Sequence, residues 1–357
     1  MKNHIRLKAS RAVRLAASML AVAAVVAGAA GIVAGRGTAA PTDTADEASP
    51  LFEGSRFERP KLIHGLLTVA GTQASDTIAL RLKAGNPGIL QVDVGDDGSA
   101  DFNFEREEIT NIVVTGQAGD DSVRIDESNG VFTDSSPTTI DGGDGNDTLA
   151  GGSGAETLLG GDGNDSIDGN FGNDTVLMGA GDDTFVYNPG DGSDTVEGQD
   201  GTDTLRINGL NVRENVDLSA NGERVRFSRA PALLVDAAGV ERVDFNALGG
   251  TDVVTVNDLT ATDVSKVYVD LAATNGGGDG QPDRVVVNAT NGDDAIDVGG
   301  DATIVKVSGL AATTEILHPE IANDRLELNT LAGTDTVDSG ALAAGAIQLF
   351  VDGVPVP

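Results

Sequence analysis

Short apolar runs alternate with turns rich in Gly, Asp and Asn from Leu62 onward, at intervals near ten residues. The runs consist mainly of Val, Ile and Leu, and their apolar side chains tend to occupy alternate positions, which is the period of a half-buried β-strand. Nothing in this region has the apolar spacing of a long helix. Regular strands separated by turns at this interval predict an all-β chain, built as a solenoid or a sandwich.

Between residues 142 and 206 the pattern becomes a repeat of nine residues, beginning GGDGNDTLA and GGSGAETLL. Seven units follow one another, with Tyr187 and Asn188 inserted after the fifth. The eighth place of each unit is apolar: Leu149, Leu158, Ile167, Val176, Phe185, Val196 and Leu205. The sixth place is acidic: Asp147, Glu156, Asp165, Asp174, Asp183, Asp194 and Asp203. Such a run indicates a repeat architecture.

Each unit can form a six-residue turn followed by a three-residue strand, so that two units complete one flattened coil. The middle strand residue then points inward and its neighbours point outward. Turns on one edge come from every second unit. We therefore expect Asp147, Asp165, Asp183 and Asp203 along one edge, and Glu156, Asp174 and Asp194 along the other.

Carboxylates stacked one strand spacing apart, about 4.8 Å, would repel one another unless a cation lies between them. An all-oxygen site made of carboxylates and turn carbonyls suits Ca²⁺ better than Mg²⁺, and a chain without Cys and with few His does not favour zinc. Turn glycines are required where the backbone takes positive φ or approaches its neighbour closely. The glycines expected at these metal sites are Gly143, Gly145, Gly161, Gly163, Gly181 and Gly192. Glu156 should form the weakest site, and the insertion at Tyr187 is expected to interrupt one.

The net charge of the chain supports a cation partner. The formal charge is −33, and residues 1–40 hold six basic side chains and no acid, so the remainder has 17 basic against 56 acidic side chains, or −39. Such a body repels nucleic acid, which is not expected as a partner. Composition alone would fit a solvated acidic surface equally well. The regular spacing of the acids favours bound cations instead.

The repeats resemble the hemolysin-type (RTX) calcium-binding repeats, whose motif is GGxGxDxUx. This resemblance implies a right-handed parallel β-roll that is disordered without calcium and binds Ca²⁺ through the sixth-place acids. The flanking segments look similar to those of large secreted bacterial calcium-binding proteins with the same repeats. Many relatives carry a C-terminal export signal, whereas this chain has an N-terminal one, so toxin activity is not expected.

Residues 1–40 predict a signal peptide, with a basic start, an uncharged stretch from Leu15 to Val33 and small residues up to Ala40. The uncharged stretch is also long enough for an uncleaved anchor, the one reading that would place the chain at a membrane. A polar linker follows at residues 41–61. The predicted location is therefore extracellular, either secreted or associated with the cell surface.

The flanks contain a second, longer repeat. Residues 241–254 match residues 324–337, and residues 111–123 are a fainter copy. We therefore predict an N-terminal β module at residues 62–132, the calcium-binding roll at 133–206 and two tandem β modules at 207–357. The segment DVGDDGSAD at residues 93–101 fits either a degenerate calcium loop or an acidic hairpin turn.

No catalytic residues are predicted, and the chain is not expected to be an enzyme. It has no HExxH motif of a zinc protease and no GxSxG elbow of a lipase, the enzymes that often carry such repeats. The predicted function is calcium binding by a secreted or cell-surface structural protein that folds on binding Ca²⁺. The alternative is an adhesin or surface-layer component whose β modules bind cell-wall carbohydrate or a neighbouring surface protein.

Overall fold

A computed structural model describes residues 57–229 and 232–357, which form one compact unit. The predicted signal peptide and most of the predicted linker lie outside the described residues. Within the described ranges, no helix is long and apolar enough to cross a membrane.

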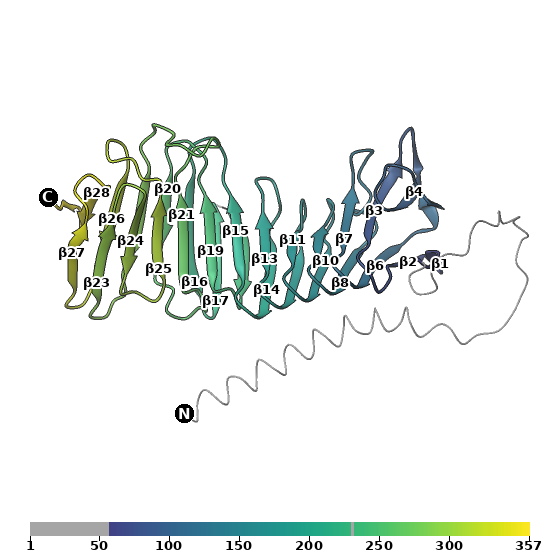
Figure 1. Cartoon of the computed structure of the whole chain (residues 1–357), viewed down its shortest axis with the longest axis horizontal. Helices are drawn as coiled ribbons and strands as arrows, with labels where there is room; N and C mark the ends of the chain where they lie inside the picture. Colours follow the sequence, from purple (N-terminus) through teal and green to yellow (C-terminus); the bar gives the residue numbers. More distant parts are fainter. Residues whose placement is uncertain (1–56, 230–231) are drawn as a thin grey trace, which may run out of the picture. The chain divides into compact units, whose positions relative to one another are not determined.

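The described chain folds into two long, mostly parallel sheets, whose strands follow one another along the sequence (Figure 1). The first sheet has 15 strands, in the order β1 (Lys61–Ile63), β2 (Leu66–Ala70), β6 (Asn111–Ala118), β8 (Thr138–Asp144), β10 (Thr157–Asp162), β12 (Thr175–Ala180), β14 (Asp194–Asp200), β18 (Ala232–Ala238), β17 (Arg224–Arg229), β16 (Asn215–Asn221), β20 (Val253–Val256), β22 (Arg284–Asn288), β26 (Arg325–Asn329), β28 (Gln348–Val351) and β29 (Val354–Pro355).

The second sheet has 14 strands, in the order β27 (Thr336–Leu342), β23 (Ala295–Gly300), β24 (Ile304–Ser308), β25 (Thr313–Leu317), β21 (Lys266–Asp270), β19 (Arg242–Asn246), β15 (Thr204–Asn208), β13 (Thr184–Tyr187), β11 (Ser166–Asp168), β9 (Thr148–Ala150), β7 (Ser122–Asp126), β3 (Thr77–Lys83), β4 (Asn86–Val94) and β5 (Phe102–Glu105). A short 3₁₀-helix, η1 (Arg106–Glu108), follows β5.

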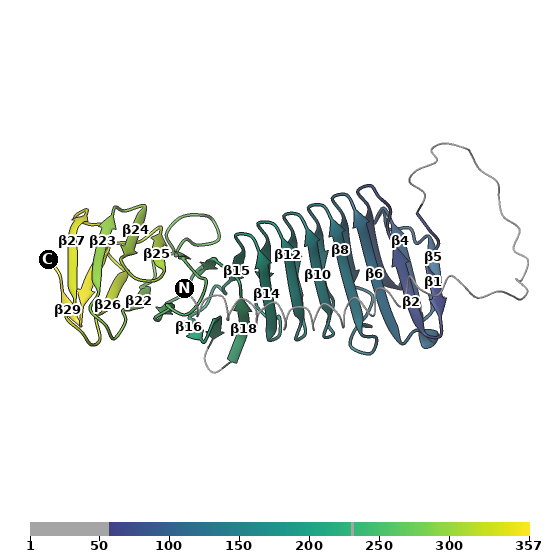
Figure 2. The same cartoon turned by 90° about the horizontal axis from the view of Figure 1, so that it is seen from below.

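The chain crosses from one sheet to the other and back, and each double crossing is one coil (Figure 2). In the second sheet Leu149 aligns with Ile167, and in the first sheet Leu158 aligns with Val176, both in parallel register. The offset is 18 residues, or two nonapeptides. The predicted all-β parallel β-roll is therefore confirmed.

We call residues 142–206 the repeat coils. Their core is thin, because β9 and β11 each bury only their middle side chain, Leu149 and Ile167. All seven eighth-place residues are at most 1% exposed, as the inward orientation predicts. Several later strands are five residues long and bury two side chains each, as β19 does with Val243 and Phe245.

Three antiparallel excursions widen the sheets outside the repeat coils. They are formed by β3, β4 and β5 before the repeats, and by β16 to β18 and β23 to β25 after them. The sheets nevertheless continue across both predicted boundaries, since β6 pairs with β8 and β15 pairs with β19. The division into modules stays a prediction, because continuous sheets do not say which segments fold independently.

The two copies of the longer repeat take opposite directions through the coil. In residues 241–254 the chain passes from β19 in the second sheet to β20 in the first. In residues 324–337 it passes from β26 in the first sheet to β27 in the second. The same strand–turn–strand sequence therefore serves both edges of the roll.

Candidate calcium sites

We name the edge whose turns lead from the first sheet to the second the first edge, and the opposite one the second edge. On the first edge the sixth-place acids of alternate repeats stack in a row. The backbone N–H of Asp147 donates to Oδ1 of Asp165 at 2.8 Å, Asp165 N–H donates to Oδ1 of Asp183 at 2.7 Å, and Asp183 N–H donates to Oδ1 of Asp203 at 3.0 Å. The structure thus brings these four acids together, as the spacing predicts.

The second edge carries the other predicted row. Glu156 N–H donates to Oδ1 of Asp174 at 2.8 Å, and Asp174 N–H donates to Oδ1 of Asp194 at 2.9 Å. Each aspartate that follows therefore uses one carboxylate oxygen to fix the turn of the preceding coil. This pattern explains why the acid always occupies the last place before the strand.

The second carboxylate oxygen of these acids is buried and has no hydrogen-bond partner. The side chains are at most 3% exposed. The unpartnered atoms are Oδ2 of Asp147, Asp165, Asp174, Asp183, Asp194 and Asp203, and Oε1 of Glu156. A buried carboxylate oxygen without a partner is costly, so a row of them indicates that a cation belongs beside it. The residues present therefore fit a hard cation such as Ca²⁺.

Backbone carbonyls face the same space as these oxygens. A Cβ placed on Gly142 would lie 2.2 Å from Oδ2 of Asp147 and 2.6 Å from the carbonyl oxygen of Gly160 in the next coil. At Gly160 the corresponding distances are 2.3 Å from Oδ2 of Asp165 and 2.1 Å from the carbonyl oxygen of Met178. A carboxylate and a carbonyl from neighbouring coils converge there, which is the donor set that calcium prefers.

The predicted turn glycines all pack against the carbonyl of a neighbouring coil. A Cβ on Gly163, where φ is +137°, would lie 1.9 Å from the carbonyl oxygen of Gly145. Gly143, Gly145, Gly161 and Gly181 also have positive φ and equally close carbonyls. Gly192 differs in having no positive φ, but its Cβ would lie 1.2 Å from the carbonyl oxygen of Gly172. Any other residue would push the coils apart.

Burial raises the pKa of these acids, and neighbouring carboxylates add to the shift for several of them. The pKa of Asp174 rises to about 8, and those of Asp165 and Asp203 rise to about 7. The pKa values of Asp183 and Asp194 rise to about 6. Without a cation, the rows are therefore driven toward the protonated form near neutral pH.

Side chains alone do not complete a metal shell. Among residues 57–229 and 232–357, no group of three or more Asp, Glu, His or Cys side chains is arranged to hold a metal ion. Each turn contributes one carboxylate, so the remaining ligands must be backbone carbonyls of the turns. A site of this kind depends on the stacking of two coils.

Glu156 is held differently from the aspartates. Its Oε2 accepts a hydrogen bond from Gly152 N–H, at 2.9 Å, within its own turn. The turn rests on Thr133, whose hydroxyl accepts from the N–H groups of Ser153 and Gly154 at 3.0 and 2.9 Å. Protein groups thus partner one carboxylate oxygen of Glu156 and its turn. The expected weakness of a site at Glu156 stays a prediction.

The insertion after the fifth repeat does not break the row on the second edge. Tyr187 is buried, and its hydroxyl donates to the carbonyl of Asp191 at 2.9 Å. The hydrogen bond from Asp174 N–H to Asp194 Oδ1 spans the insertion. Tyr187 extends strand β13, where it pairs with Ile207, so the row of acids continues across the insertion. The interruption of a calcium site at the insertion stays a prediction.

The acidic segment at residues 93–101 forms the hairpin turn between β4 and β5. Asp93 is fully buried and pairs with Arg81, with 2.6 Å between its Oδ2 and the guanidinium. Asp101 accepts a hydrogen bond from Val94 N–H at 2.8 Å. An arginine and the turn backbone thus partner one oxygen of each of these carboxylates, while Oδ1 of Asp93 is buried without a partner. The segment is a hairpin turn, and a calcium loop there stays a prediction.

The rows of acids extend beyond the predicted residues. On the first edge the same hydrogen bonds link Asp76 to Asp121, Asp121 to Asp147 and Asp203 to Glu241. On the second edge they join four further acids: Glu214, Asp252, Asp283 and Asp324. The signal that could have found them is an acid directly before a strand, as in GGTDVV at Asp252 and QPDRVV at Asp283.

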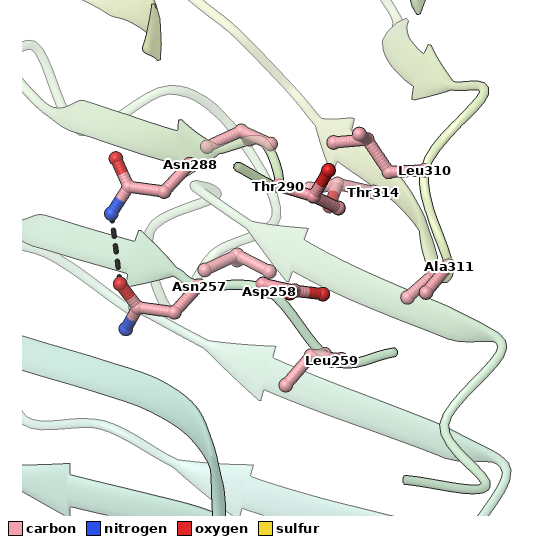
Figure 3. A pocket seen from close by; sticks show the side chains of 11 residues that line it. Asn257, Asp258, Leu259, Asn288, Thr290, Leu310, Ala311 and Thr314 are labelled. Carbon is pink, nitrogen blue, oxygen red and sulfur yellow. Dashed lines mark hydrogen bonds between the residues drawn. The ribbon is translucent and has the colours of Figure 1, made fainter. Parts of the chain in front are cut away.

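A small space between the coils lies away from these rows (Figure 3). It measures about 10 Å³, enough for one water molecule, and it is lined by Asn257, Asn288, Thr290 and Thr314 among others. Asn288 Nδ2 donates to Oδ1 of Asn257 at 2.8 Å. This space belongs to a ladder of stacked asparagines and is too small for a substrate.

Comparison with known families agrees with this geometry. The family described as the RTX calcium-binding nonapeptide repeat matches in four copies, over residues 139–155, 150–185 and 190–206. A search of curated proteins found no significant match to the chain. The matched residues are those in which the acids and glycines described above form the two rows.

Proposed function

We propose that this β-roll, whose RTX repeats bind calcium, belongs to an exported structural protein that completes its folding when calcium binds. The observation that carries the proposal is the row of buried carboxylate oxygens without partners, on both edges of the repeat coils. The proposal includes no catalytic activity, since the sequence has neither the HExxH nor the GxSxG motif.

The residues that would hold calcium are the sixth-place aspartates with carbonyls of the stacked turns. On the first edge these include Asp147 with Gly160, and Asp165 with Met178. Bound calcium supplies positive charge to the unpartnered oxygens and links adjacent coils. The aspartates themselves orient the turns through Oδ1, so the acids are held in place by the backbone of the preceding coil.

Calcium should decide whether the repeat coils fold. The strands β9 and β11 bury one side chain each, whereas ordering each residue of a glycine-rich chain costs on the order of 1 to 2 kcal/mol. A ligand that binds only the stacked turns adds its binding free energy to the folded state alone. An affinity of about 10⁻⁴ to 10⁻³ M, as in extracellular calcium modules, would match such a role.

Export is supported by the sequence of residues 1–40, whose basic start and apolar stretch predict a signal peptide. Low free calcium inside a cell would leave the repeats open for passage, and higher calcium outside would fold them. The protein would be associated with a membrane only if the signal segment remained attached. N-terminal sequencing of the exported protein should give a start between Gly31 and Pro41, whereas Met1 would favour an anchor.

A second candidate, an adhesin or surface-layer component, is favoured by a groove on the C-terminal part of the first sheet. This groove measures about 520 Å³ and is lined by the row acids Asp252 and Asp283 and by the hydrogen-bond donors Arg213, Arg284, Arg325, Asn323 and Gln348, among others. These side chains can donate hydrogen bonds to sugar hydroxyl or carboxylate groups. Retention on cell-wall polysaccharide in calcium, abolished by Arg213→Ala, is the expected result.

The test of the proposed function is far-ultraviolet circular dichroism of the chain without residues 1–40, first in chelator and then in millimolar CaCl₂. We expect β-structure to increase with calcium and the repeat coils to become resistant to protease. A protease-resistant roll of unchanged spectrum in chelator would show that the stack needs no calcium.

A further inference from the structure

The turn at residues 116–121, between β6 and β7, lies directly before the repeat coils on the first edge. Its sequence, GQAGDD, has Gly at places 1 and 4 and Asp at place 6, as GGDGND has in the first repeat turn at residues 142–147. The match to the RTX family begins at residue 139 and does not include this turn.

This turn stacks on the first repeat in the same way as one repeat stacks on the next. Gly119 N–H donates to the carbonyl of Asp144 at 2.7 Å, and Gly145 N–H donates to the carbonyl of Asp162 at the same distance. A Cβ on Gly145 would lie 2.1 Å from the carbonyl oxygen of Gly119, which is the close approach seen between repeats. The backbone of the turn is therefore placed as in a repeat.

The acid of this turn has the same environment as the repeat acids. Asp121 is 2% exposed, its N–H donates to Oδ1 of Asp147 at 2.8 Å, and its own Oδ2 is buried without a partner. A Cβ on Gly116 would lie 2.2 Å from that Oδ2 and 2.4 Å from the carbonyl oxygen of Gly142. At Gly142 the corresponding distances are 2.2 and 2.6 Å.

The turn one coil earlier, at residues 71–76, shows how such a row ends. Oδ2 of Asp76 accepts a hydrogen bond from Thr72 N–H at 2.5 Å, within its own turn. That oxygen has a protein partner, whereas Oδ2 of Asp121 has none. Along the first edge, Asp121 is therefore the first acid whose second carboxylate oxygen is buried without a partner. A cation there would lie between the turn of Asp121 and the first repeat turn.

We propose that the turn at residues 116–121 forms a calcium site with the first repeat turn, in which Asp121 supplies a carboxylate oxygen and Gly142 a carbonyl oxygen. The inference rests on the proposed calcium binding of the repeats and extends it to a turn outside them. Calcium at this site ties the N-terminal coils to the roll.

The test is the number of calcium ions bound per chain, measured by equilibrium dialysis with radioactive calcium on the chain without residues 1–40. Asp121→Asn removes one formal charge and the proposed ligand oxygen. Asp120→Asn is the matched control, because Asp120 lies next door, its Oδ1 accepts from Asn146 N–H at 2.8 Å, and Asn146 and Asn164 fill the same place in the repeats.

We expect Asp121→Asn to bind one calcium fewer than the unchanged chain, and Asp120→Asn to bind the same number. Equal numbers for all three proteins would overturn the site while leaving calcium binding by the repeats intact. An unchanged chain that binds no calcium would overturn the proposed function itself.

A second measurement decides the matter if Asp121→Asn fails to fold. Crystals of the unchanged chain grown in CaCl₂ should show an anomalous calcium peak about 2.3 to 2.6 Å from a carboxylate oxygen of Asp121. Calcium peaks between the repeat turns, with none beside Asp121, would overturn the proposed site.

Discussion

The repeat coils and the coils that follow them share one backbone plan but differ in how they balance charge. Residues 142–206 contain fourteen acidic side chains and one basic one, Arg206. After residue 206, arginines stand next to the acids. Glu214 of the second edge pairs with Arg229, at 2.6 Å between Oε1 and Nε. Arg242, Arg284 and Arg325 each directly follow an acid of a row in the sequence, but they form ion pairs with Asp244 and Glu327 instead.

The core differs in parallel with the charge. The repeat strand β11 buries only Ile167, whereas β19 buries Val243 and Phe245, and Phe245 packs against Phe227 with 5.5 Å between ring centroids. The first place of the turn also changes, from Gly142 in a repeat to the buried Ala247 in a later turn. The comparison teaches that the later coils supply a fuller core and part of their own counter-charge, at Glu214, although Oδ2 of Asp252 is buried without a partner as in the repeats. The repeat coils, with one basic side chain, depend most on an external cation.

The largest expected effect comes from the core of the later coils. Phe245→Ala should lower the free energy of unfolding by about 3 to 5 kcal/mol, because it empties a fully buried aromatic site. The loss should be similar with calcium and with chelator. Urea denaturation in both conditions measures this loss. A loss of stability that appears only in chelator would contradict the claim that the later coils are stable without calcium.

Removing a repeat acid should act through calcium instead. Asp165→Ala and Asp183→Ala should each weaken calcium binding about tenfold or more, about 1.4 kcal/mol, because each lies between two neighbours in its row. Glu156→Ala should cost less, since Gly152 already occupies one oxygen of Glu156. Isothermal titration calorimetry compares the three, and equal losses would contradict the assignment of the edges.

The calcium-free protein should be more stable at pH 5 than at pH 8. Burial raises the pKa of Asp174 from its ordinary value of 3.8 to about 8 and that of Asp165 to about 7. Protonation therefore favours the folded state; this stability is fully present below pH about 4 and is lost as the pH rises through about 6 to 8. Calcium competes with these protons, so its affinity should rise over the same range.

Thermal melts in chelator at several pH values test this dependence. Asp174→Asn is the informative variant, because the neutral amide cannot titrate, so the fall of the melting temperature between pH 6 and pH 8 should be smaller, with Asp165 and Asp203 still titrating. A calcium-free protein that melts higher at pH 8 than at pH 5 would contradict the raised pKa values.

The smallest effect is expected at an arginine of the later coils. Arg242→Gln should cost less than about 1 kcal/mol, because the Arg242–Asp244 pair, at 2.6 Å, is partly exposed to solvent. Calcium affinity should not change. Calorimetry measures the calcium affinity. A loss of calcium binding in this variant would show that calcium binding by the repeat coils depends on the coils that follow them.

The strictest part of the repeat was also the most predictable from sequence. The inward position of Leu149 and the row of Asp147, Asp165 and Asp183 follow from a period of nine residues and alternate side-chain directions. Asp121 and Asp252 were missed because their turns lack the full glycine pattern, although each acid still precedes a strand. Local sequence could not reveal the antiparallel excursions, which make Asp194 pair with Val235 and hide the regular offset between coils.

Hydrogen–deuterium exchange read out by mass spectrometry tests the central claim most directly, because it follows both regions in one protein. The chain without residues 1–40 would be labelled in chelator and in millimolar CaCl₂ at pH 8. The account predicts rapid exchange of residues 142–206 in chelator and strong protection with calcium, while β19, β22 and β26 stay protected in both. Equal protection of the repeat coils with and without calcium would contradict it.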